Sequence, residues 1–480
     1  MQNSDFIREE CGIFGVHGQK NSDVVAQTYL ALYALQHRGQ ESCGIAVNDD
    51  GVIGYHRDLG LVPDVFTRDI LTGLGKGNMA LGHVRYASKG SKSRSHAQPI
   101  VVRHIKGNMA LAFNGCLTNS AELREEAELS GAIFHSASDI EVISHVITRA
   151  RLTARSIEEA VSFAMDKLKG SYSLVVMSPS KMIACRDPNG FRPLCMGCKD
   201  DNIIFASETC ALDSIGASLV REIEPGEIVV ADKNGVNSNR SHCAGKGTLC
   251  VFEFVYFARP DSVISGVNVQ EARQRAGEYL ALENPVEADV VIGVPDSGIP
   301  AALGYARESG IPYGIGFLKN RYIDRTFIQP TQLERELSVK IKLNVIESTV
   351  RNKRVVLIDD SIVRGTTCAR IIRLLREAGA KEVHMRVSAP PFMHPCYFGT
   401  NIDSRENLIA CKMSIPEIAK WIGVDSLGYL SVGSVLKIAE NASCGFCAGC
   451  FTGEYPAPGP SMKAGTKFDR RISEKAGEEE

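Results

Sequence analysis

The chain has 480 residues, of which 44% are hydrophobic and 23% are charged, and its formal net charge is −2. At roughly 100–200 residues per domain, this length predicts two or three globular domains. The near-neutral charge argues against nucleic acid or an anionic membrane as the main partner. No apolar run reaches the ~20 residues of a membrane span, and the acidic start MQNSDFIREE lacks the apolar core of a secretory signal, so we expect a cytoplasmic protein.

The two halves of the chain differ in their predicted elements. Residues 11–245 contain many short strand patterns and only two longer helical patterns, near 24–36 and 139–152, which predicts a sheet-rich, layered α+β domain. From residue 246 to about 455, buried strands alternate with helices, which predicts an α/β domain with a parallel sheet. Residues 456–480 are rich in Pro, Gly and charge, and we expect a disordered tail there.

Cys11 is the first candidate catalytic residue in the chain. It opens the string CGIFG, but a lone cysteine is more often a small buried hydrophobic residue than a nucleophile. Four further strings change that assessment: QHRGQE (36–41), GHVRYAS (82–88), FNGCL (113–117) and SDIE (138–141). Together the five strings resemble the N-terminal-nucleophile glutamine amidotransferases, which implies a layered αββα domain over 11–245. In that family the cysteine must be the first residue, so residues 1–10 would be a propeptide.

The resemblance implies a role for five residues. The α-amino group of Cys11, with a pKa of about 7.7–8.0, would take the proton of its own thiol, and the thiolate would attack the side-chain amide of glutamine. Asn114 and Gly115 would donate hydrogen bonds to the oxyanion that develops. Arg85 would bind the α-carboxylate of glutamine and Asp139 its α-ammonium, although each of these two alone fits a surface ion pair equally well.

The sharpest local signal is the string VVLIDDSIVRGTT (355–367), in which an apolar strand ends in Asp359 and Asp360 and a helix follows a short loop. Amides and hydroxyls at a helix N-terminus favour a phosphate, and the two acids could hold ribose hydroxyls directly or through Mg²⁺. An isolated pair of aspartates would more often cap a helix in a solvated loop. The candidate phosphate-binding residues of the loop are Ser361, Arg364, Gly365, Thr366 and Thr367.

This string resembles the signature of the type I phosphoribosyltransferases, which bind phosphoribosyl pyrophosphate (PRPP). The string VPDSGIPAA (294–302) resembles the pyrophosphate loop of that family, and Ser297 with Asp359 and Asp360 is the expected site of one Mg²⁺ per subunit. The string KNRYIDRTF (319–327) would be a flap that closes over PRPP, although a basic stretch alone is usually solvated surface. Its expected ligands are Lys319, Arg321, Tyr322 and Arg325.

The order of the two halves resembles the amidophosphoribosyltransferase family over about residues 11–455, with FARPDS (257–262) and RDPNGFRPL (186–194) as further matching strings. The resemblance implies the first committed step of purine synthesis, in which glutamine, PRPP and water give 5-phosphoribosylamine, pyrophosphate and glutamate. Ammonia would pass between the two sites through a closed channel. The resemblance also implies feedback inhibition by purine nucleotides and a homotetramer. Two alternatives stay open: a PRPP-binding regulator with a relic glutaminase domain, and an aminotransferase for another sugar phosphate.

Fifteen cysteines are many for a chain of this length, and without a signal sequence they favour metal binding or catalysis over disulfides. The string CGFCAGC (444–450) favours a metal or iron–sulfur site that needs further thiolates, and its spacing alone leaves open Cys243, Cys250, Cys368, Cys396 and Cys411 as candidates. The iron–sulfur branch of the family implies one structural [4Fe-4S] cluster per subunit, with zinc as the alternative. Its ligands would be Cys250, Cys396, Cys447 and Cys450, with Cys243 and Cys444 as spares.

Overall fold

The computed structural model describes residues 11–18, 22–86, 93–320, 343–400, 402 and 404–460. These residues form two compact units. The first unit contains the described residues from 11 to 249, together with 397–400 and 455–460. The second contains 250–320, 343–396, 402 and 404–454. Within the described ranges, no helix is both long and apolar enough to cross a membrane.

The first unit is built on two antiparallel sheets. One sheet has the order β11-β9-β10-β1-β4-β2-β3 and the other the order β13-β12-β8-β7-β6-β5. The strands of the first sheet are β1 (Gly12–His17), β2 (Ser42–Asp49), β3 (Val52–Leu59), β4 (Met79–Arg85), β9 (Cys195–Lys199), β10 (Asn202–Ala206) and β11 (Ser218–Glu222). Those of the second are β5 (Ile100–His104), β6 (Gly107–Leu117), β7 (Gly170–Met177), β8 (Met182–Arg186), β12 (Ile228–Asp232) and β13 (Gly235–Asn239).

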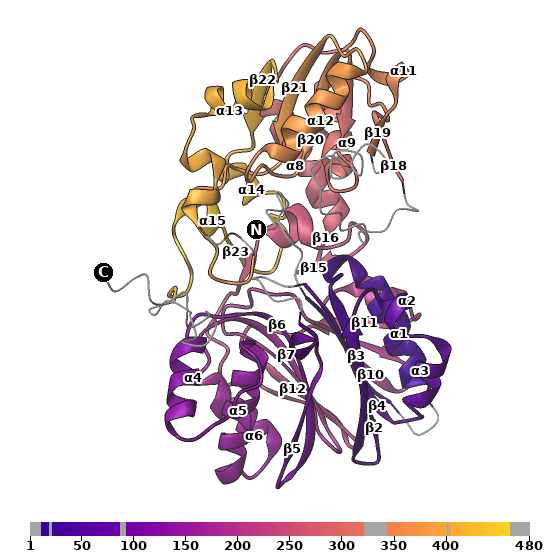
Figure 1. Cartoon of the computed structure of the whole chain (residues 1–480), viewed down its shortest axis with the longest axis vertical. Coiled ribbons are helices and arrows are strands. Elements are labelled where there is room, and N and C mark those ends of the chain that lie inside the picture. Colours follow the sequence, from indigo (N-terminus) through magenta and orange to yellow (C-terminus); the bar gives the residue numbers. More distant parts are fainter. Residues whose placement is uncertain are drawn as a thin grey trace, which may run out of the picture. The chain divides into compact units, whose positions relative to one another are not determined.

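Helices cover the outer face of each sheet (Figure 1). The helices on the first sheet are α1 (Val24–Ala34), α2 (Val62–Val65), α3 (Arg68–Gly73) and α7 (Thr209–Asp213). Those on the second are α4 (Ser120–Leu129), α5 (Asp139–Thr153) and α6 (Ile157–Met165). In α6, residues 157, 160, 161, 164 and 165 are buried, which is the i, i+3, i+4 spacing of an amphipathic helix.

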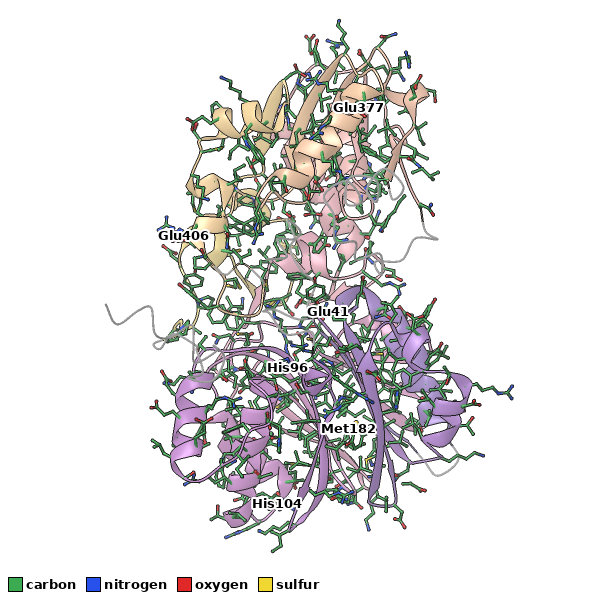
Figure 2. All side chains as sticks on the ribbon, viewed as in Figure 1. Glu41, His96, His104, Met182, Glu377 and Glu406 are labelled. Carbon is green, nitrogen blue, oxygen red and sulfur yellow. The ribbon has the colours of Figure 1, made fainter. Side chains whose placement is uncertain are left out.

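A separate apolar cluster fills the space between the two sheets. Ile13 and Leu81 come from the first sheet, and Ala112 and Met182 come from the second; all four are fully buried. Figure 2 labels Met182 in this inner layer. Because both faces of each sheet are covered, strands such as β2 are buried on nearly every residue rather than on alternate ones. The predicted αββα layering is confirmed.

The second unit contains a parallel sheet of order β17-β20-β21-β22. Its strands are β17 (Val290–Gly293), β20 (Arg354–Asp359), β21 (Glu382–Val387) and β22 (Ser426–Tyr429). The main helices are α8 (Val269–Glu283), α9 (Gly298–Ser309), α12 (Thr366–Glu377) and α13 (Ile415–Ile422). In β20, Val355 and Leu357 face the cluster that contains the apolar residues of α12 and α13, while Val356 is buried on the opposite face. The predicted α/β parallel sheet is confirmed.

Shorter elements complete the second unit. They include the π-helix η3 (Glu253–Phe257), β15 (Val263–Ile264), β16 (Val267–Asn268), β18 (Phe317–Lys319), β19 (Leu343–Val345), α11 (Glu347–Val350), α14 (Val432–Val435), β23 (Gly445–Cys447) and α15 (Gly449–Thr452). The strands β18 and β19 pair with each other and lie on either side of residues 321–342, which fall outside the described residues.

Candidate active sites

Cys11 stands at the start of β1, beside the end of β4 that carries Arg85. The antiparallel register of the two strands pairs Gly12 with Val84, so Cys11 and Arg85 are at neighbouring strand ends. Cys11 is partly exposed, and its Sγ lies 4.0 Å from the carbonyl oxygen of Tyr86. A partly exposed cysteine at a strand end can reach a ligand that a fully buried cysteine cannot.

A buried ion pair holds the backbone of the candidate nucleophile. Arg38 donates from Nε to the carbonyl of Cys11 at 3.1 Å, and its Nη1 lies 2.6 Å from Oε1 of Glu208. Both side chains are fully buried, and His37 Nε2 lies 2.8 Å from the same carboxylate oxygen. Arg38 belongs to the string QHRGQE, but its role could not be predicted from the sequence, because its partner Glu208 lies 170 residues further along the chain.

Asn114 and Gly115 lie on β6 of the other sheet. Asn114 is 1% exposed, and no described group accepts a hydrogen bond from its Nδ2. Gly115 has φ +147, and a Cβ there would lie 2.1 Å from the carbonyl oxygen of Ser171, so this position requires glycine. A buried amide donor without an acceptor is uncommon in proteins and points to a ligand that supplies one.

Two contacts bring the remaining parts of this site to β6. His83 of β4, two residues before Arg85, is fully buried and donates from Nε2 to the carbonyl of Phe113 at 3.0 Å. Asp139, the first residue of α5, accepts from the backbone N–H of Leu117 at 2.8 Å. Burial raises the pKa of Asp139 against the lowering effect of its hydrogen bonds and of Arg124. The predicted glutamine-site residues therefore lie on elements that contact one another: β1, β4, β6 and α5.

In the second unit, Asp359 ends β20 and Asp360 follows it at the carboxyl edge of the sheet. The N–H of Asp360 donates to Oδ1 of Asp359 at 2.9 Å, and the hydroxyls of Ser297 and Ser361 donate to the two carboxylate oxygens of Asp360. Burial raises the pKa of both acids, and for Asp359 the neighbouring Asp360 raises it further. Two desolvated carboxylates with hydroxyl neighbours match the oxygen ligands that Mg²⁺ prefers.

The predicted phosphate loop connects β20 to α12. Gly365 has φ +82 and precedes Thr366, the first residue of α12, so the loop ends at a helix N-terminus. Arg364 carries a buried Nη1 for which no described group is a hydrogen-bond acceptor. Cys368, in the first turn of α12, is buried with its Sγ 3.9 Å from Oδ2 of Asp359. The amides of the loop and the helix dipole can therefore receive an anion.

Lys319, at the end of β18, forms an ion pair with Asp296 of the predicted pyrophosphate loop. The other predicted flap residues, Arg321, Tyr322 and Arg325, lie outside the described residues, as do the predicted propeptide (1–10) and residues 461–480 of the predicted tail.

Four cysteines gather in the second unit. Cys450 is half-buried, and its pKa is raised well above the usual value by desolvation and by the nearby thiols of Cys396, Cys250 and Cys447. These are the four ligands that the resemblance implied. Within the described ranges, no group of three or more His, Cys, Asp or Glu side chains has the geometry to hold a metal ion, so the four thiols do not form a compact mononuclear site as they stand. Cys444 instead contacts the hydroxyl of Ser265 at 3.2 Å.

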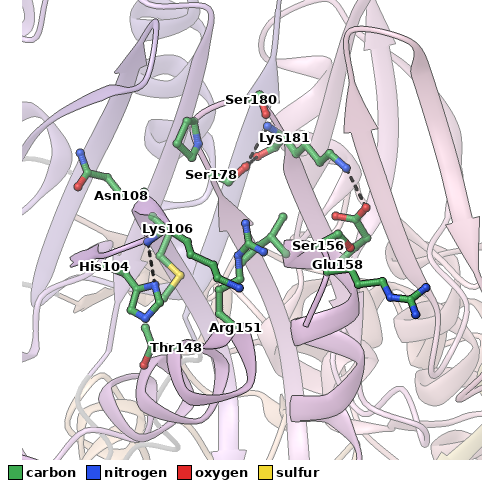
Figure 3. A pocket seen from close by; sticks show the side chains of 15 residues that line it. His104, Lys106, Asn108, Thr148, Arg151, Ser156, Glu158, Ser178, Ser180 and Lys181 are labelled. Atoms are coloured by element: carbon green, nitrogen blue, oxygen red, sulfur yellow. Dashed lines mark hydrogen bonds and ion pairs between the residues drawn. The ribbon is translucent and has the colours of Figure 1, made fainter. Parts of the chain in front are cut away.

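A cavity of about 370 Å³ lies elsewhere in the first unit, between the β5–β6 turn, α5, α6 and the β7–β8 turn (Figure 3). Its lining is basic, with Lys106, Arg151 and Arg155, and Lys181 pairs there with Glu158 at 2.8 Å. It contains none of the predicted site residues. The candidate sites above are defined by their side-chain chemistry rather than by the size of a cavity.

Comparison with known proteins identifies relatives of both units. Residues 83–214 match the family of glutamine amidotransferase domains, and residues 270–424 match the family of phosphoribosyl transferase domains. The chain is 47% identical over 461 residues to the amidophosphoribosyltransferase of Methanocaldococcus jannaschii, which covers 93% of this chain and 97% of that protein. It is 45% identical over 455 residues to the amidophosphoribosyltransferase of Bacillus subtilis, with 94% of each chain covered.

Solved structures agree with these matches. The glutamine PRPP amidotransferase from B. subtilis, complexed with ADP and GMP, is similar with a TM-score of 0.87 at 45% identity, over 93% of this chain and 98% of that chain. A structure described as the allosteric regulatory enzyme of purine biosynthesis is similar with a TM-score of 0.88 at 45% identity, over 94% of this chain and 97% of that chain.

Proposed function

Because this chain belongs to the amidophosphoribosyltransferase family and catalyses the glutamine-dependent amination of PRPP, we propose that Cys11 releases the ammonia and that Asp359–Thr367 hold the PRPP. Membership of this family excludes the two alternatives, a PRPP-binding regulator and an aminotransferase for another sugar phosphate. The residue assignment rests on one observation: the buried Nδ2 of Asn114 has no acceptor among the described groups. Asn114 lies on β6, which is hydrogen-bonded through His83 to β4, the strand that carries Arg85. Strand β4 in turn pairs with β1, which Cys11 precedes.

The first half-reaction cleaves glutamine. Once residues 1–10 are removed, the free α-amine of Cys11 takes the proton of its thiol, and the thiolate attacks the side-chain amide. Asn114 Nδ2 and the Gly115 N–H donate to the oxyanion, and the guanidinium of Arg85 and the carboxylate of Asp139 hold the α-carboxylate and the α-ammonium. The glutamyl thioester releases ammonia, and water then releases glutamate. Arg38 holds the Cys11 carbonyl, so the nucleophile stays oriented between these steps.

The second half-reaction places ammonia on the ribose of PRPP. Ser361, Arg364, Gly365, Thr366 and Thr367 hold the 5-phosphate at the N-terminus of α12. Asp359 and Asp360 hold ribose hydroxyls, and together with Ser297 they would bind one Mg²⁺ per subunit, which would neutralise charge on the pyrophosphate. Lys319, Arg321, Tyr322 and Arg325 bind the leaving pyrophosphate and exclude water.

We assign the two half-reactions to residues 11–245 and 246–455, with 1–10 as propeptide and 456–480 as tail. The division of the described residues near 249 and 250 supports this assignment. Free ammonia is protonated in neutral water and loses its nucleophilicity, so we propose that it reaches the ribose through a closed, largely apolar channel.

We propose that Cys250, Cys396, Cys447 and Cys450 bind one [4Fe-4S] cluster per subunit. The convergence of three thiols on Cys450 supports it, and a four-iron cluster is larger than a single ion, so its ligands stand further apart than those of zinc. The cluster would be structural, because neither half-reaction transfers electrons. Anaerobically purified protein should contain four iron and four sulfide per chain, as expected for this cluster type.

A matched pair of variants tests the ligand set. Cys396→Ser should lower the iron content sharply, while Cys444→Ser should leave it unchanged, because Cys444 contacts Ser265 instead. Stoichiometric zinc without iron in the wild type would refute the cluster.

The B. subtilis relative was solved with ADP and GMP. We propose that purine nucleotides bind and inhibit this chain, and that it is a cytoplasmic homotetramer. Inhibition assays with purine nucleotides and light scattering of the purified protein test these two proposals.

The central experiment compares nitrogen sources. Cys11→Ala should abolish glutamine-dependent product formation but retain activity with ammonia at raised pH, where more of the ammonia is unprotonated. Intact mass measurement of the wild type should show loss of residues 1–10. Loss of both activities in Cys11→Ala, with the protein folded, would contradict the two-site assignment.

A further inference from the structure

A short segment from the C-terminal half of the chain packs inside the first unit. Residues 397–400 directly follow Cys396 of the second unit in sequence, yet they belong to the first unit. Phe398 is 2% exposed, and its ring stacks on that of Phe191 with centroids 4.3 Å apart and an interplanar angle of 14°. Tyr455 adds an edge contact to Phe398 at 6.0 Å. The aromatic stack fixes the position of the Phe398 main chain.

The carbonyl of Phe398 accepts two hydrogen bonds from fully buried side chains. Ser171 donates from its hydroxyl at 2.7 Å, and Arg192 donates from Nη2. The same Ser171 hydroxyl accepts from the backbone N–H of Cys116 at 3.1 Å. A hydroxyl has one proton, so its donation to Phe398 directs the oxygen lone pairs toward Cys116.

Cys116 follows Gly115, one of the two proposed oxyanion donors. The Cys116 N–H lies in the peptide unit that follows Gly115, and the proposed donor N–H of Gly115 lies in the unit before it. The two units meet at the Gly115 Cα, where φ is +147 and no Cβ restrains the backbone. The strand register places Cys116 opposite Ser171, and the Cys116 N–H bonds to the side chain of its partner. The Ser171 hydroxyl therefore holds the backbone immediately beside the oxyanion hole.

We infer that Ser171 and the docked Phe398 carbonyl are positioning groups of the glutaminase site, which orient Gly115 through the Cys116 N–H. The inference rests on the proposed role of Asn114 and Gly115 as oxyanion donors. It adds to the glutaminase site a segment that follows Cys396 and lies far beyond residues 83–214, where the amidotransferase match lies. The segment from the second half of the chain thus completes the first site.

The decisive variant is Ser171→Ala, with Ser178→Ala as its matched control. Ser178 lies just beyond the other end of β7, is also buried, and also donates to one main-chain group and accepts from another, both of Lys181. In Ser171→Ala, kcat for glutamine hydrolysis should fall about tenfold or more, with KM for glutamine and the ammonia-dependent activity unchanged. Ser178→Ala should leave all three parameters unchanged.

A transition-state readout separates positioning from a general loss of structure. The aldehyde analogue of glutamine forms a tetrahedral adduct with a thiolate, whose oxygen occupies the oxyanion hole. Its affinity should fall in Ser171→Ala by the same factor as kcat/KM, while the affinity for the product glutamate stays at the wild-type value. Phe398→Ala removes the ring stack and should produce a loss in the same parameters, which keeps the inference testable if Ser171→Ala does not fold.

Three outcomes would overturn the inference. The first is a wild-type kcat in both Ser171→Ala and Phe398→Ala. The second is an equal loss of the glutamine and ammonia activities in Ser171→Ala, and the third is an unchanged affinity of Ser171→Ala for the aldehyde. A failure of the proposed function would give a different result, because Cys11→Ala would then still use glutamine.

Discussion

Asn114 combines features that seldom occur together in one residue: it is polar, 1% exposed, and its amide Nδ2 has no acceptor among the described groups. An unsatisfied buried donor costs about 1–3 kcal/mol in stability. Such a cost persists where the donor serves a ligand, because the oxyanion that forms during catalysis then provides the acceptor in a site already desolvated.

We therefore expect Asn114→Ala to lower kcat for glutamine by about 10²-fold or more and to leave the ammonia-dependent activity intact. Steady-state kinetics with each nitrogen source would measure this. Asn202→Ala, at another buried asparagine of the same unit, serves as a control and should not change kcat. Equal effects of the two substitutions would argue against an oxyanion role for Asn114.

Asp360 differs from Asn114 because the proposed assignment places it in the site that both nitrogen sources share. Asp360→Asn should reduce activity with glutamine and with ammonia alike, by about 10²-fold or more, since the carboxylate charge toward ribose and Mg²⁺ is lost. Asp289→Asn, which removes an exposed acid paired with Arg354 at 2.9 Å, should leave both activities near wild type. An effect of Asp360→Asn on glutamine use alone would contradict the shared site.

At the scale of elements, the closest helix pair of the second unit is α8 with α9, and glycines set its spacing. A Cβ at Gly277 of α8 would lie 1.9 Å from the carbonyl oxygen of Ala301, and one at Gly304 of α9 would lie 1.9 Å from that of Gln274. Helix α9 begins within the predicted pyrophosphate loop, so this packing also fixes the start of the helix to which that loop leads.

Gly277→Ala should therefore destabilise the second unit by about 1–3 kcal/mol, because the added methyl group forces the two helices apart. Thermal unfolding followed by circular dichroism would show a lower transition temperature. Gly73→Ala in α3 is the matched control, since nothing lies within 4 Å of a Cβ there. It should be neutral or slightly stabilising, because alanine favours helix more than glycine does. A neutral Gly277→Ala would mean that the helices can separate without cost.

At the scale of the whole molecule, buried titratable groups make stability depend on pH. Burial lowers the pKa of His83 to about 3, against an ordinary value of 6.5. Above pH 6.5 the native and unfolded states both hold a neutral His83, so the group adds no pH dependence. As pH falls from 6.5 toward 3, the unfolded chain gains a proton that the native state does not, and unfolding becomes easier.

We expect the loss of stability between pH 7.5 and pH 5 to be smaller in His83→Gln than in the wild type, even though the variant is less stable at pH 7.5. Urea unfolding midpoints at the two pH values would measure the difference. The comparison isolates His83 because other groups act equally in both proteins, including Asp187, whose pKa burial raises to about 6. If the unfolding midpoints of the wild type and His83→Gln fell by the same amount between the two pH values, His83 would not be held neutral in the native state.

The sequence by itself determined the features that are encoded locally. The string 355–367 contains a strand, two acids, a loop and a helix start in thirteen consecutive residues, and the structure forms those elements in that order. The short strand patterns of residues 11–245 predicted a sheet-rich, layered domain. The strings around Cys11, Arg85 and Asn114 resemble a family whose fold is the αββα layering. The family resemblance then supplied the order of the two activities.

Only the tertiary structure decided which distant residues support those sites. Arg38 contacts Glu208 across 170 positions, and Ser171 contacts Phe398 across 227. The spacing of CGFCAGC left its further partners open, and the fold brings Cys250 and Cys396 toward Cys450 while it places Cys444 against Ser265. No local pattern predicts such pairs, because their energy comes from burial and hydrogen bonding that arise only when separate elements pack together.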